Sequence, residues 1–467
     1  MLFEVKKMIK TPRTKMREQD PQERINHFLE VALGYSLEEA IEEAKRCIDC
    51  KNPRCVVACP VRVKIPEFIK LLIENALDES FQKIYEDNIL PSICGRVCPQ
   101  ESQCEGACIL GIKSEPVSIG ALERFVGDYG MEKDLATTGA PKSNGTKVAV
   151  IGSGPAGLAN AASLRKKGYD VTIFEALHDY GGVLKYGIPD FRLPKDIVTN
   201  EINNLKDLGV TFIKNAVIGK SLTIDQLFED HYEAIFIGSG AGLPSAIGVP
   251  GENLNGVYYA NEFLTRVNLM KSRTDFASET PIKLGDNIAV VGGGNVAMDA
   301  ARTAKRLGAK NVFILYRRGR EGLPARLEEI HHAEQEGIDF KLLTNPIEII
   351  GENRVVKQVK CEHMKLGEPD SSGRRRPLPT GEHSTFDIDN IIISIGQKPN
   401  PILKDNTANL ETQPWGGIIT DEFQMTSIPG VFAGGDVVTG AATVILAMGA
   451  GKDAAHHMDE YLQNKQR

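Results

Sequence analysis

Residues 147–175, KVAVIGSGPAGLANAASLRKKGYDVTIFE, decide the fold of this chain. An opening apolar run predicts a strand, and Gly152, Gly154 and Gly157 then match G-x-G-x-x-G at the start of a helix. The first glycine permits a tight turn, the second lets backbone N–H groups approach a pyrophosphate, and the third allows close helix–strand packing. A second apolar run ends in Glu175, whose carboxylate suits the hydroxyls of an adenosine ribose. The stretch therefore predicts a dinucleotide-binding domain rather than a structural glycine turn.

The same pattern returns later in the chain, where the strand-like residues NIAVV lead into Gly292 and Gly294. Alanine takes the third position, which is an accepted variant. The next strand ends in Arg317 and Arg318, where the first copy has Glu175. No carboxylate is there to repel a 2′-phosphate, and two guanidinium groups can bind it. The second copy is therefore predicted to bind NADPH rather than NADH; the alternative is that both arginines are surface charges.

Eight of the nine cysteines lie between residues 47 and 108. They form the groups Cys47-x2-Cys50-x4-Cys55-x3-Cys59-Pro and Cys94-x3-Cys98-Pro-x4-Cys104-x3-Cys108. Short spacings that end in Cys-Pro are similar to the bacterial ferredoxin run, although the middle spacing here is four rather than two. Closely spaced thiolates on turns are what an iron–sulfur cube requires, while zinc is the main alternative and disulfides a lesser one. The pattern favours iron–sulfur clusters.

Length and composition predict the organisation of the chain. A chain of 467 residues is too long for one core, so about three domains are expected. We expect helix over residues 20–46, with a capping box at Ser36 leading into EEAIEEAKR. A linker is expected over the Gly-, Pro-, Ser- and Asn-containing stretch 127–144. The fold class is α/β, with two Rossmann-like domains of the glutathione-reductase-like type, the second inserted in the first. The expected domains are a helical iron–sulfur domain at 1–140, a first nucleotide domain at 146–280 that resumes at 396–467, and an NADPH domain at 281–395.

The charge balance limits the kinds of partner. The net charge of −7 argues against nucleic acid or an anionic membrane surface. No run of about 18 apolar residues predicts a membrane span, and the N-terminal residues lack the apolar core of a signal peptide. We therefore expect a cytoplasmic protein.

With these pieces in order, the chain resembles the NADPH glutamate synthase small-subunit family. That family's relatives include the N-terminal half of dihydropyrimidine dehydrogenase and the large subunit of NADH-dependent reduced ferredoxin:NADP oxidoreductase. The resemblance covers nearly the whole chain and is carried by CxxCxxxxCxxxCP, CGRVCPQESQCEGAC, IGSGPAGLA, GIPDFRLP, the Tyr-Arg-Arg strand end and a late GGD segment. The N-terminal lead-in and residues 319–340 look closer to the ferredoxin:NADP oxidoreductase large subunit.

The resemblance implies FAD in the first nucleotide domain, NADPH in the second and two [4Fe–4S] clusters in the N-terminal domain. By resemblance the ligands of the first cluster are Cys47, Cys50, Cys55 and Cys108, and those of the second are Cys59, Cys98, Cys104 and Glu123. Cys94 is then spare, although eight cysteines would also make two four-cysteine sites. The implied FAD residues are Gly152, Gly154, Pro155, Ala156, Gly157, Glu175, Gly182, Leu184, Arg192, Gly240 and Asp436. The implied NADPH residues are Gly292, Gly294, Asn295, Val296, Arg317 and Arg318.

The implied function is electron transfer between NADP(H), FAD and the clusters, with no protein acid or nucleophile at the hydride step. The favoured partners are ferredoxin and a smaller FAD/[2Fe–2S] subunit, in a complex whose flavin bifurcates electrons. The alternative partner is the large subunit of glutamate synthase, and the non-enzymatic alternative is an NADPH- or redox-sensing scaffold. A disulfide reductase is excluded, because residues 109–467 hold only Cys361 and so no redox cysteine pair.

Overall fold

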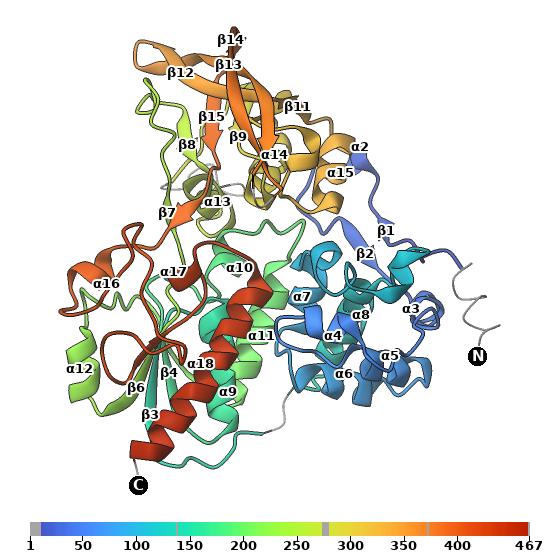
Figure 1. The fold of residues 1–467 in the computed structure, drawn as a ribbon, viewed down its shortest axis with the longest axis vertical. Coiled ribbons are helices and arrows are strands. Elements are labelled where there is room, and N and C mark those ends of the chain that lie inside the picture. The colour runs from blue at the N-terminus through green and yellow to red at the C-terminus, as the bar shows by residue number, and fades with distance from the viewer. Residues whose placement is uncertain (1–10, 137–138, 273–279, 371–372, 466–467) are drawn as a thin grey trace.

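The computed structural model describes residues 11–136, 139–272, 280–370 and 373–465. Three regions are visible in Figure 1: a helical N-terminal region, a first nucleotide domain that carries the C-terminal helix, and a second nucleotide domain topped by a long β-hairpin. The fold class expected from the sequence is confirmed.

The N-terminal region is built from short helices around the cysteines. Its elements are β1 (Arg17–Glu18), α2 (Pro21–Arg24), β2 (Ala32–Gly34), α3 (Leu37–Ala44), α4 (Arg54–Ala58), α5 (Ile65–Ile73), α6 (Leu77–Tyr85), α7 (Pro91–Val97), η1 (Gln100–Ser102), η2 (Ile109–Ile112) and α8 (Ile119–Glu132). The prediction of helix over residues 20–46 is wrong in its middle, because β2 pairs with β1 there, but the predicted capping box at Ser36 is confirmed. Gly34 has φ +79°, which breaks the helix, and Ser36 then caps α3 in a capping box with Glu39.

The predicted linker also begins too early, since α8 continues to Glu132. Two of the glycines that suggested a linker are packing positions in this helix. A Cβ at Gly127 would lie 2.6 Å from the backbone N of Ser92, and one at Gly130 would lie 2.0 Å from the ring of Phe81. Residues 137 and 138 of the predicted linker lie outside the described residues.

The first nucleotide domain is a parallel sheet in the order β17-β6-β3-β4-β5. Its strands are β3 (Lys147–Ile151), β4 (Asp170–Phe174), β5 (Thr211–Ile213), β6 (Tyr232–Ile237) and β17 (Val431–Ala433). Its helices are α9 (Pro155–Lys166), α10 (Val183–Tyr186), α11 (Lys195–Asp207), α12 (Ile224–Glu229), α16 (Ile402–Asp405), α17 (Asp436–Thr439) and α18 (Val444–Lys465). The strand of the nucleotide motif, β3, is therefore the central strand of the sheet, and α9 follows it directly in the chain.

The second nucleotide domain repeats this plan with a parallel sheet in the order β11-β10-β9-β15-β8. Its strands are β8 (Val257–Tyr259), β9 (Asn287–Val291), β10 (Asn311–Tyr316), β11 (Asp339–Leu342) and β15 (Asn390–Ile393). Its helices are α13 (Ala260–Asn268), α14 (Asn295–Arg306), η3 (Arg320–Gly322) and α15 (Leu327–Gln335). The antiparallel strands β12 (Thr344–Glu352), β13 (Val355–Pro369) and β14 (Arg375–Asp387) form the projecting hairpin layer.

The chain crosses between the nucleotide domains at β7 (Leu243–Pro244) and returns at β16 (Gln397–Lys398), and these two segments pair with each other. Strand β8 belongs to the second sheet, and α13 packs in the same core. The first crossing therefore lies near residue 244 rather than at the expected boundary of 281. The sequence missed it because β8 is only three residues long.

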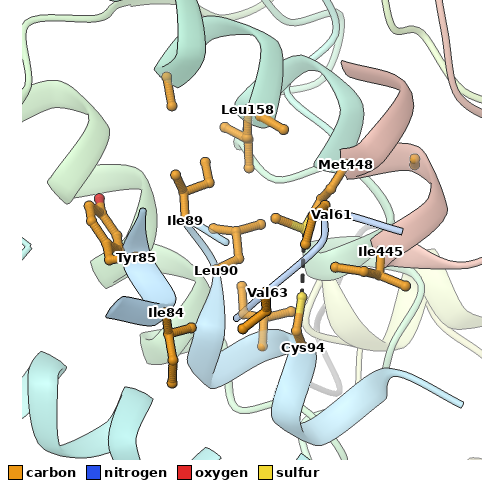
Figure 2. Close-up of a cluster of buried hydrophobic side chains, with 14 of the residues drawn as sticks. Val61, Val63, Ile84, Tyr85, Ile89, Leu90, Cys94, Leu158, Ile445 and Met448 are labelled. Atoms are coloured by element: carbon orange, nitrogen blue, oxygen red, sulfur yellow. Dashed lines mark hydrogen bonds between the residues drawn. The ribbon is translucent and has the colours of Figure 1, made fainter. Parts of the chain in front are cut away.

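A single apolar core joins the N-terminal region to the first nucleotide domain. Figure 2 shows its centre, where Val61, Leu90 and Cys94 from the cysteine region meet Leu158 of α9 and Met448 of α18. The second nucleotide domain has separate cores on the two faces of its sheet. The cysteine region and the first domain are thus one packed unit. Within the described ranges, no helix is both long and apolar enough to cross a membrane.

Candidate cofactor-binding sites

A cavity of about 390 Å³ opens at the carboxyl end of β3. Gly152 has φ +101°, and a Cβ there would lie 2.6 Å from the carbonyl oxygen of Gly238. Gly157 packs against the strand, since its Cβ would lie 1.9 Å from the Gly152 oxygen. Gly154 meets nothing within 4 Å and lines the cavity. The three glycines therefore have the three roles that their spacing predicts, and the open position faces the start of α9, where a pyrophosphate fits.

Glu175 lies at the end of β4 and lines the same cavity. Its carboxylate accepts hydrogen bonds from the N–H (2.9 Å) and hydroxyl (2.5 Å) of Ser153 and from the N–H of Leu177 (2.9 Å). These donors fix the orientation of a carboxylate that is only 7% exposed. Each carboxylate oxygen can accept more than one hydrogen bond, so a ribose hydroxyl can still bind.

Asp436 borders the cavity from the opposite side, at the first residue of α17. Burial raises the pKa of its carboxyl to about 6, and the N–H of Ala442 donates to it at 3.3 Å. A half-buried carboxyl beside an open cavity suits a hydroxyl-bearing ligand such as a ribityl chain. The other expected residues that line this cavity are Pro155, Ala156, Gly182 and Gly240.

Two residues expected in the FAD site lie elsewhere. Leu184 is fully buried in the shared core and is not among the residues that line the cavity. Arg192 forms ion pairs with Asp299 of α14 (2.7 Å) and Glu329 of α15 (3.1 Å) in the second nucleotide domain. Arg192 therefore joins the two domains through a buried ion-pair network, and the motif GIPDFRLP gave no sign of this.

A second cavity of about 750 Å³ lies at the carboxyl ends of β9 and β10. All six expected NADPH residues line it: Gly292, Gly294, Asn295, Val296, Arg317 and Arg318. Arg317 is exposed and Arg318 is half-buried. Among the described residues neither guanidinium has an ion-pair partner, and the Nε of Arg318 is a buried donor without an acceptor. Two uncommitted cations beside a glycine turn fit a 2′-phosphate.

The two cavities share Asn261 of α13 and Gln397 of β16 as lining residues. Gln397 lies in the returning crossing and Asn261 at the start of α13, so the two cavities adjoin where the domains meet. The sequence offered no signal for either residue, because each lies outside a nucleotide motif. Their place follows from domain packing alone.

The first expected ligand set is gathered in one apolar recess. Cys47, Cys50, Cys55 and Cys108 line it together with isoleucine, leucine and valine side chains. All four thiols are partly exposed. Burial raises the pKa of Cys47 to about 11 and that of Cys55 to about 12, so the thiolate form needs a cation beside it.

The second expected ligand set is buried more deeply. Cys59, Cys98 and Cys104 are 6–9% exposed and Glu123 is 8% exposed. The Glu123 carboxylate is close enough to influence the pKa values of all three thiols. Burial raises the pKa of Glu123 to about 7, while a hydrogen bond from Asn88 (2.7 Å) favours the ionised form. The fold thus brings three thiols and one carboxylate together across a span of 65 residues of sequence.

The cysteine sulfur atoms are not gathered at the spacing of a zinc site. A zinc ion with bonds of about 2.3 Å holds its sulfur ligands about 3.8 Å apart. In the described part of the chain, no three cysteine sulfurs lie within 4.8 Å of one another, alone or with a histidine or carboxylate. A [4Fe–4S] cube binds each thiolate at a different corner and needs the wider spacing. All nine cysteines are free thiols, which excludes the disulfide alternative.

Helix α18 connects the first cavity to the second ligand set. Ala447 lines the cavity, and the next residue, Met448, has its Sδ 3.6 Å from the Sγ of Cys94. A Cβ at Gly449 would lie 3.1 Å from the carbonyl oxygen of Pro60, which follows Cys59. Figure 2 shows the contact between Met448 and Cys94 surrounded by apolar side chains. The helix therefore borders the cavity at β3, here called the flavin-type cavity, and also contacts the neighbours of the deeper ligand set.

A third cavity, of about 600 Å³, lies between the N-terminal segment, α8 and α15. Glu18, Glu328 and His332 lie on its wall, and one possible metal-ligand atom from each lies within 4.8 Å of the other two. However, Glu328 pairs with Arg326 (2.8 Å) and Glu18 pairs with His332 (3.1 Å). The contact between Glu18 and His332 joins the N-terminal segment to the second nucleotide domain, so these side chains already have partners within the chain.

Two family models match the chain, one over the cysteine region and one over the nucleotide domains. The model of dihydropyrimidine dehydrogenase domain II, 4Fe-4S cluster, matches residues 24–135, and the pyridine nucleotide-disulphide oxidoreductase model matches residues 146–451. The chain is 40% identical over 435 residues to the NADP(+)-dependent formate dehydrogenase subunit beta of Moorella thermoacetica, covering 88% of this chain and 60% of that protein. It is 36% identical over 451 residues to the glutamate synthase [NADPH] small chain of Azospirillum brasilense, covering 95% and 93%.

Among solved structures, FprA of Mycobacterium tuberculosis aligns with a TM-score of 0.59 at 22% identity, covering 69% of this chain and 85% of FprA. That likeness shows the fold of the paired nucleotide domains. The disulphide oxidoreductase match carries no redox cysteine pair here, because Cys361, the one cysteine of that region, is buried on β13. The chain belongs to the NADPH glutamate synthase small-subunit family and is an NADP(H)-dependent flavin and iron–sulfur oxidoreductase.

Proposed function

We propose that this chain is the NADP(H)-facing subunit of an electron-transfer complex, with two [4Fe–4S] clusters in series between its FAD and a partner protein. The carrying observation is the order of the sites. The NADPH-type cavity adjoins the flavin-type cavity at Asn261 and Gln397, and α18 connects the latter to the deeper ligand set. The partly exposed ligand set then lies toward the surface.

In the nucleotide cavities the protein's work is binding and orientation. Arg317 and Arg318 would hold the 2′-phosphate of NADPH, and Glu175 and Asp436 would hold the ribose and ribityl hydroxyls of FAD. Bound there, the two cofactors supply hydride exchange between nicotinamide and flavin. The shared wall at the domain joint would bring the reacting rings together and exclude water.

In the cysteine region the two ligand sets would have different tasks. Helix α18 contacts Cys94 and Pro60, which are neighbours of the deeper set. That set, Cys59, Cys98, Cys104 and Glu123, would therefore hold the cluster that faces the flavin. Cys47, Cys50, Cys55 and Cys108 would hold the cluster that faces the partner. Val57 (67% exposed) and Ile112 (69%) flank this outer set, and such exposed apolar side chains suit a docking surface.

The favoured partners are ferredoxin and a smaller FAD/[2Fe–2S] subunit, in an electron-bifurcating complex. The support is the resemblance of the N-terminal lead-in and residues 319–340 to the ferredoxin:NADP oxidoreductase large subunit. The second candidate is the large subunit of glutamate synthase, favoured by the match that covers 93% of the Azospirillum brasilense small chain.

The partner test is anaerobic purification of the chain with its native complex. Co-purification of a smaller flavoprotein with a [2Fe–2S] cluster supports bifurcation, whereas a much larger amidotransferase-type chain supports glutamate synthase. The proposed order of the NADPH site, the FAD site and the two clusters does not depend on the partner's identity and has a separate test.

The site order is tested with the full chain and its Cys55→Ser variant. Wild type should contain FAD and about eight iron atoms and oxidise NADPH with both artificial and cluster-dependent acceptors. The variant should keep NADPH oxidation with an acceptor that takes electrons from flavin and lose the cluster-dependent reaction. If both wild type and the variant bind NADPH and neither oxidises it with any acceptor, the chain is a sensing scaffold.

A further inference from the structure

Asn88 lies in the turn between α6 and α7 and is fully buried. Its carboxamide contacts both groups that compete for the fourth position of the deeper ligand set. The Nδ2 donates a hydrogen bond to Oε1 of Glu123 at 2.7 Å. The Oδ1 faces the thiol of Cys94, at 3.7 Å. The nitrogen of this amide therefore contacts the expected ligand Glu123, and its oxygen contacts the spare cysteine Cys94.

The orientation of this amide is fixed by the backbone around it. The N–H of Leu90 donates to Oδ1 at 2.9 Å, so that end must be the oxygen and the other end must be the donor. The N–H of Asn88 itself donates to the carbonyl of Ile84 at 2.8 Å, which ties the turn to the end of α6. The Nδ2 group can therefore serve only as a donor to Glu123.

The two contacts have opposite consequences for metal binding. A donor to one oxygen of Glu123 stabilises its carboxylate and leaves the other oxygen for iron. The Cys94 thiol instead meets an amide oxygen and the Sδ of Met448 (3.6 Å), inside the apolar layer of Figure 2. To become a ligand, Cys94 would have to give up its contacts with Asn88 and Met448.

We propose that Asn88 is a positioning residue that presents Glu123 to the deeper cluster and keeps Cys94 out of its coordination. The inference rests on the proposed function only in requiring a cluster at Cys59, Cys98 and Cys104. Residues that orient a metal ligand affect metal affinity about 10- to 100-fold when they are changed.

The test uses the full chain, purified anaerobically, with iron content, the EPR signal of the reduced clusters and the rate of iron loss to a chelator as readouts. Asn88→Asp keeps the size of the side chain and the acceptor for Leu90 but sets a carboxylate against Glu123. Iron release from one cluster should then become about 10- to 100-fold faster, with its EPR signal changed and that of the other cluster kept.

A reciprocal variant separates positioning from folding. In Asn88→Asp with Glu123→Gln, the new amide can donate to the new carboxylate and turn its carbonyl oxygen toward iron. This double variant should regain about eight iron atoms, with an EPR signal that differs from wild type because the ligand is neutral. The matched control is Cys94→Ser, which should keep the iron content and both EPR signals.

The outcomes separate the inference from the proposed function. A wild-type chain with about four iron atoms would overturn the two-cluster function itself. With about eight iron atoms in wild type, unchanged iron release and EPR in Asn88→Asp would overturn the role of Asn88. Loss of one cluster in Cys94→Ser would make Cys94 the ligand and would overturn it too.

Discussion

At the scale of single residues, the two nucleotide domains differ in the charge at the end of one strand. Glu175 and Arg317 follow equivalent strands of the two nucleotide domains, yet they have opposite charges. The carboxylate is held by Ser153 and Leu177, while the guanidinium lines an open cavity without an ion-pair partner among the described residues. One position is therefore built for hydroxyls and the other for a phosphate.

We expect Arg317→Ala combined with Arg318→Ala to weaken NADPH binding more than NADH binding. Each charged hydrogen bond lost to the 2′-phosphate costs about 1.5–3 kcal/mol, and NADH has no such group. Dissociation constants for both nucleotides measure the difference. Arg376→Ala, an exposed arginine on β14, is the matched control and should change neither. An equal loss for the two nucleotides would contradict the 2′-phosphate assignment.

Glu201 of α11 predicts a pH dependence of stability. It is 3% exposed, and burial raises its pKa from 4.5 to about 8. Between those two pH values the unfolded chain loses a proton that the folded chain keeps. The free energy of unfolding therefore falls as the pH rises through this window, by about 1.4 kcal/mol per pKa unit.

Glu201→Gln removes this titration and keeps the acceptor for Asn204 (3.3 Å). The variant should match wild type near pH 4 and exceed it in stability increasingly up to pH 8. Thermal midpoints of both proteins between pH 4.5 and 8 test this, and parallel curves would show that Glu201 titrates normally in the folded chain.

At the scale of elements, short helices carry the outer ligand set and the docking surface proposed beside it. Helix α4 is only five residues long, and the recess that holds Cys55 also receives Cys108 from the start of η2. Val57 and Ile112 project beside that recess and are exposed. A partner that covers them would bring its own redox centre close to the outer ligand set.

Val57→Asp with Ile112→Asp should therefore impair the natural electron acceptor selectively. Loss of a central apolar contact costs about 2 kcal/mol or more, so the KM for the partner should rise at least about 10-fold. NADPH oxidation with an artificial acceptor should stay at the wild-type rate. Val355→Asp, at an exposed apolar position of β13, controls for added charge. An unchanged KM would place the partner on another face.

At the scale of the whole molecule, buried charges fasten the domains together. The guanidinium carbons of Arg302 and Arg306 lie 4.6 Å and 4.0 Å from the ring centroid of Phe191. Arg24 of the N-terminal segment shares Glu336 with those arginines. The N-terminal segment, the loop that contains Phe191 and the second nucleotide domain thus meet in one ion-pair network.

Arg192→Leu should destabilise the protein strongly. Removing this guanidinium leaves Asp299 and Glu329 buried with fewer counter-charges, at a cost of about 3–5 kcal/mol. Arg192→Leu with Asp299→Leu should recover part of that loss, because both charges leave together. Thermal unfolding of the cofactor-loaded proteins measures the effect. A single variant as stable as wild type would remove Arg192 from the domain joint.

The sequence by itself determined the two nucleotide domains, their ligands' charge and the cysteine groups. Glycine turns, apolar runs and strand-end charges depend on residues that are close in the sequence. The spacing of Gly152, Gly154 and Gly157 was therefore enough to predict the first nucleotide motif. The helix predicted at 20–46 failed for the same reason. Its apolar spacing is local, whereas the antiparallel pairing of β1 with β2 is a tertiary contact.

The tertiary structure alone decided how these parts are joined. Arg192 looked like a flavin residue in its motif, but its charge is compensated by Asp299 and Glu329, which lie more than a hundred positions later in the chain. Asn88 approaches Glu123, and Asn261 borders both cavities, only because distant segments pack together. Burial turns such contacts into strong constraints, since a charge or amide taken out of water must find its partner inside the fold.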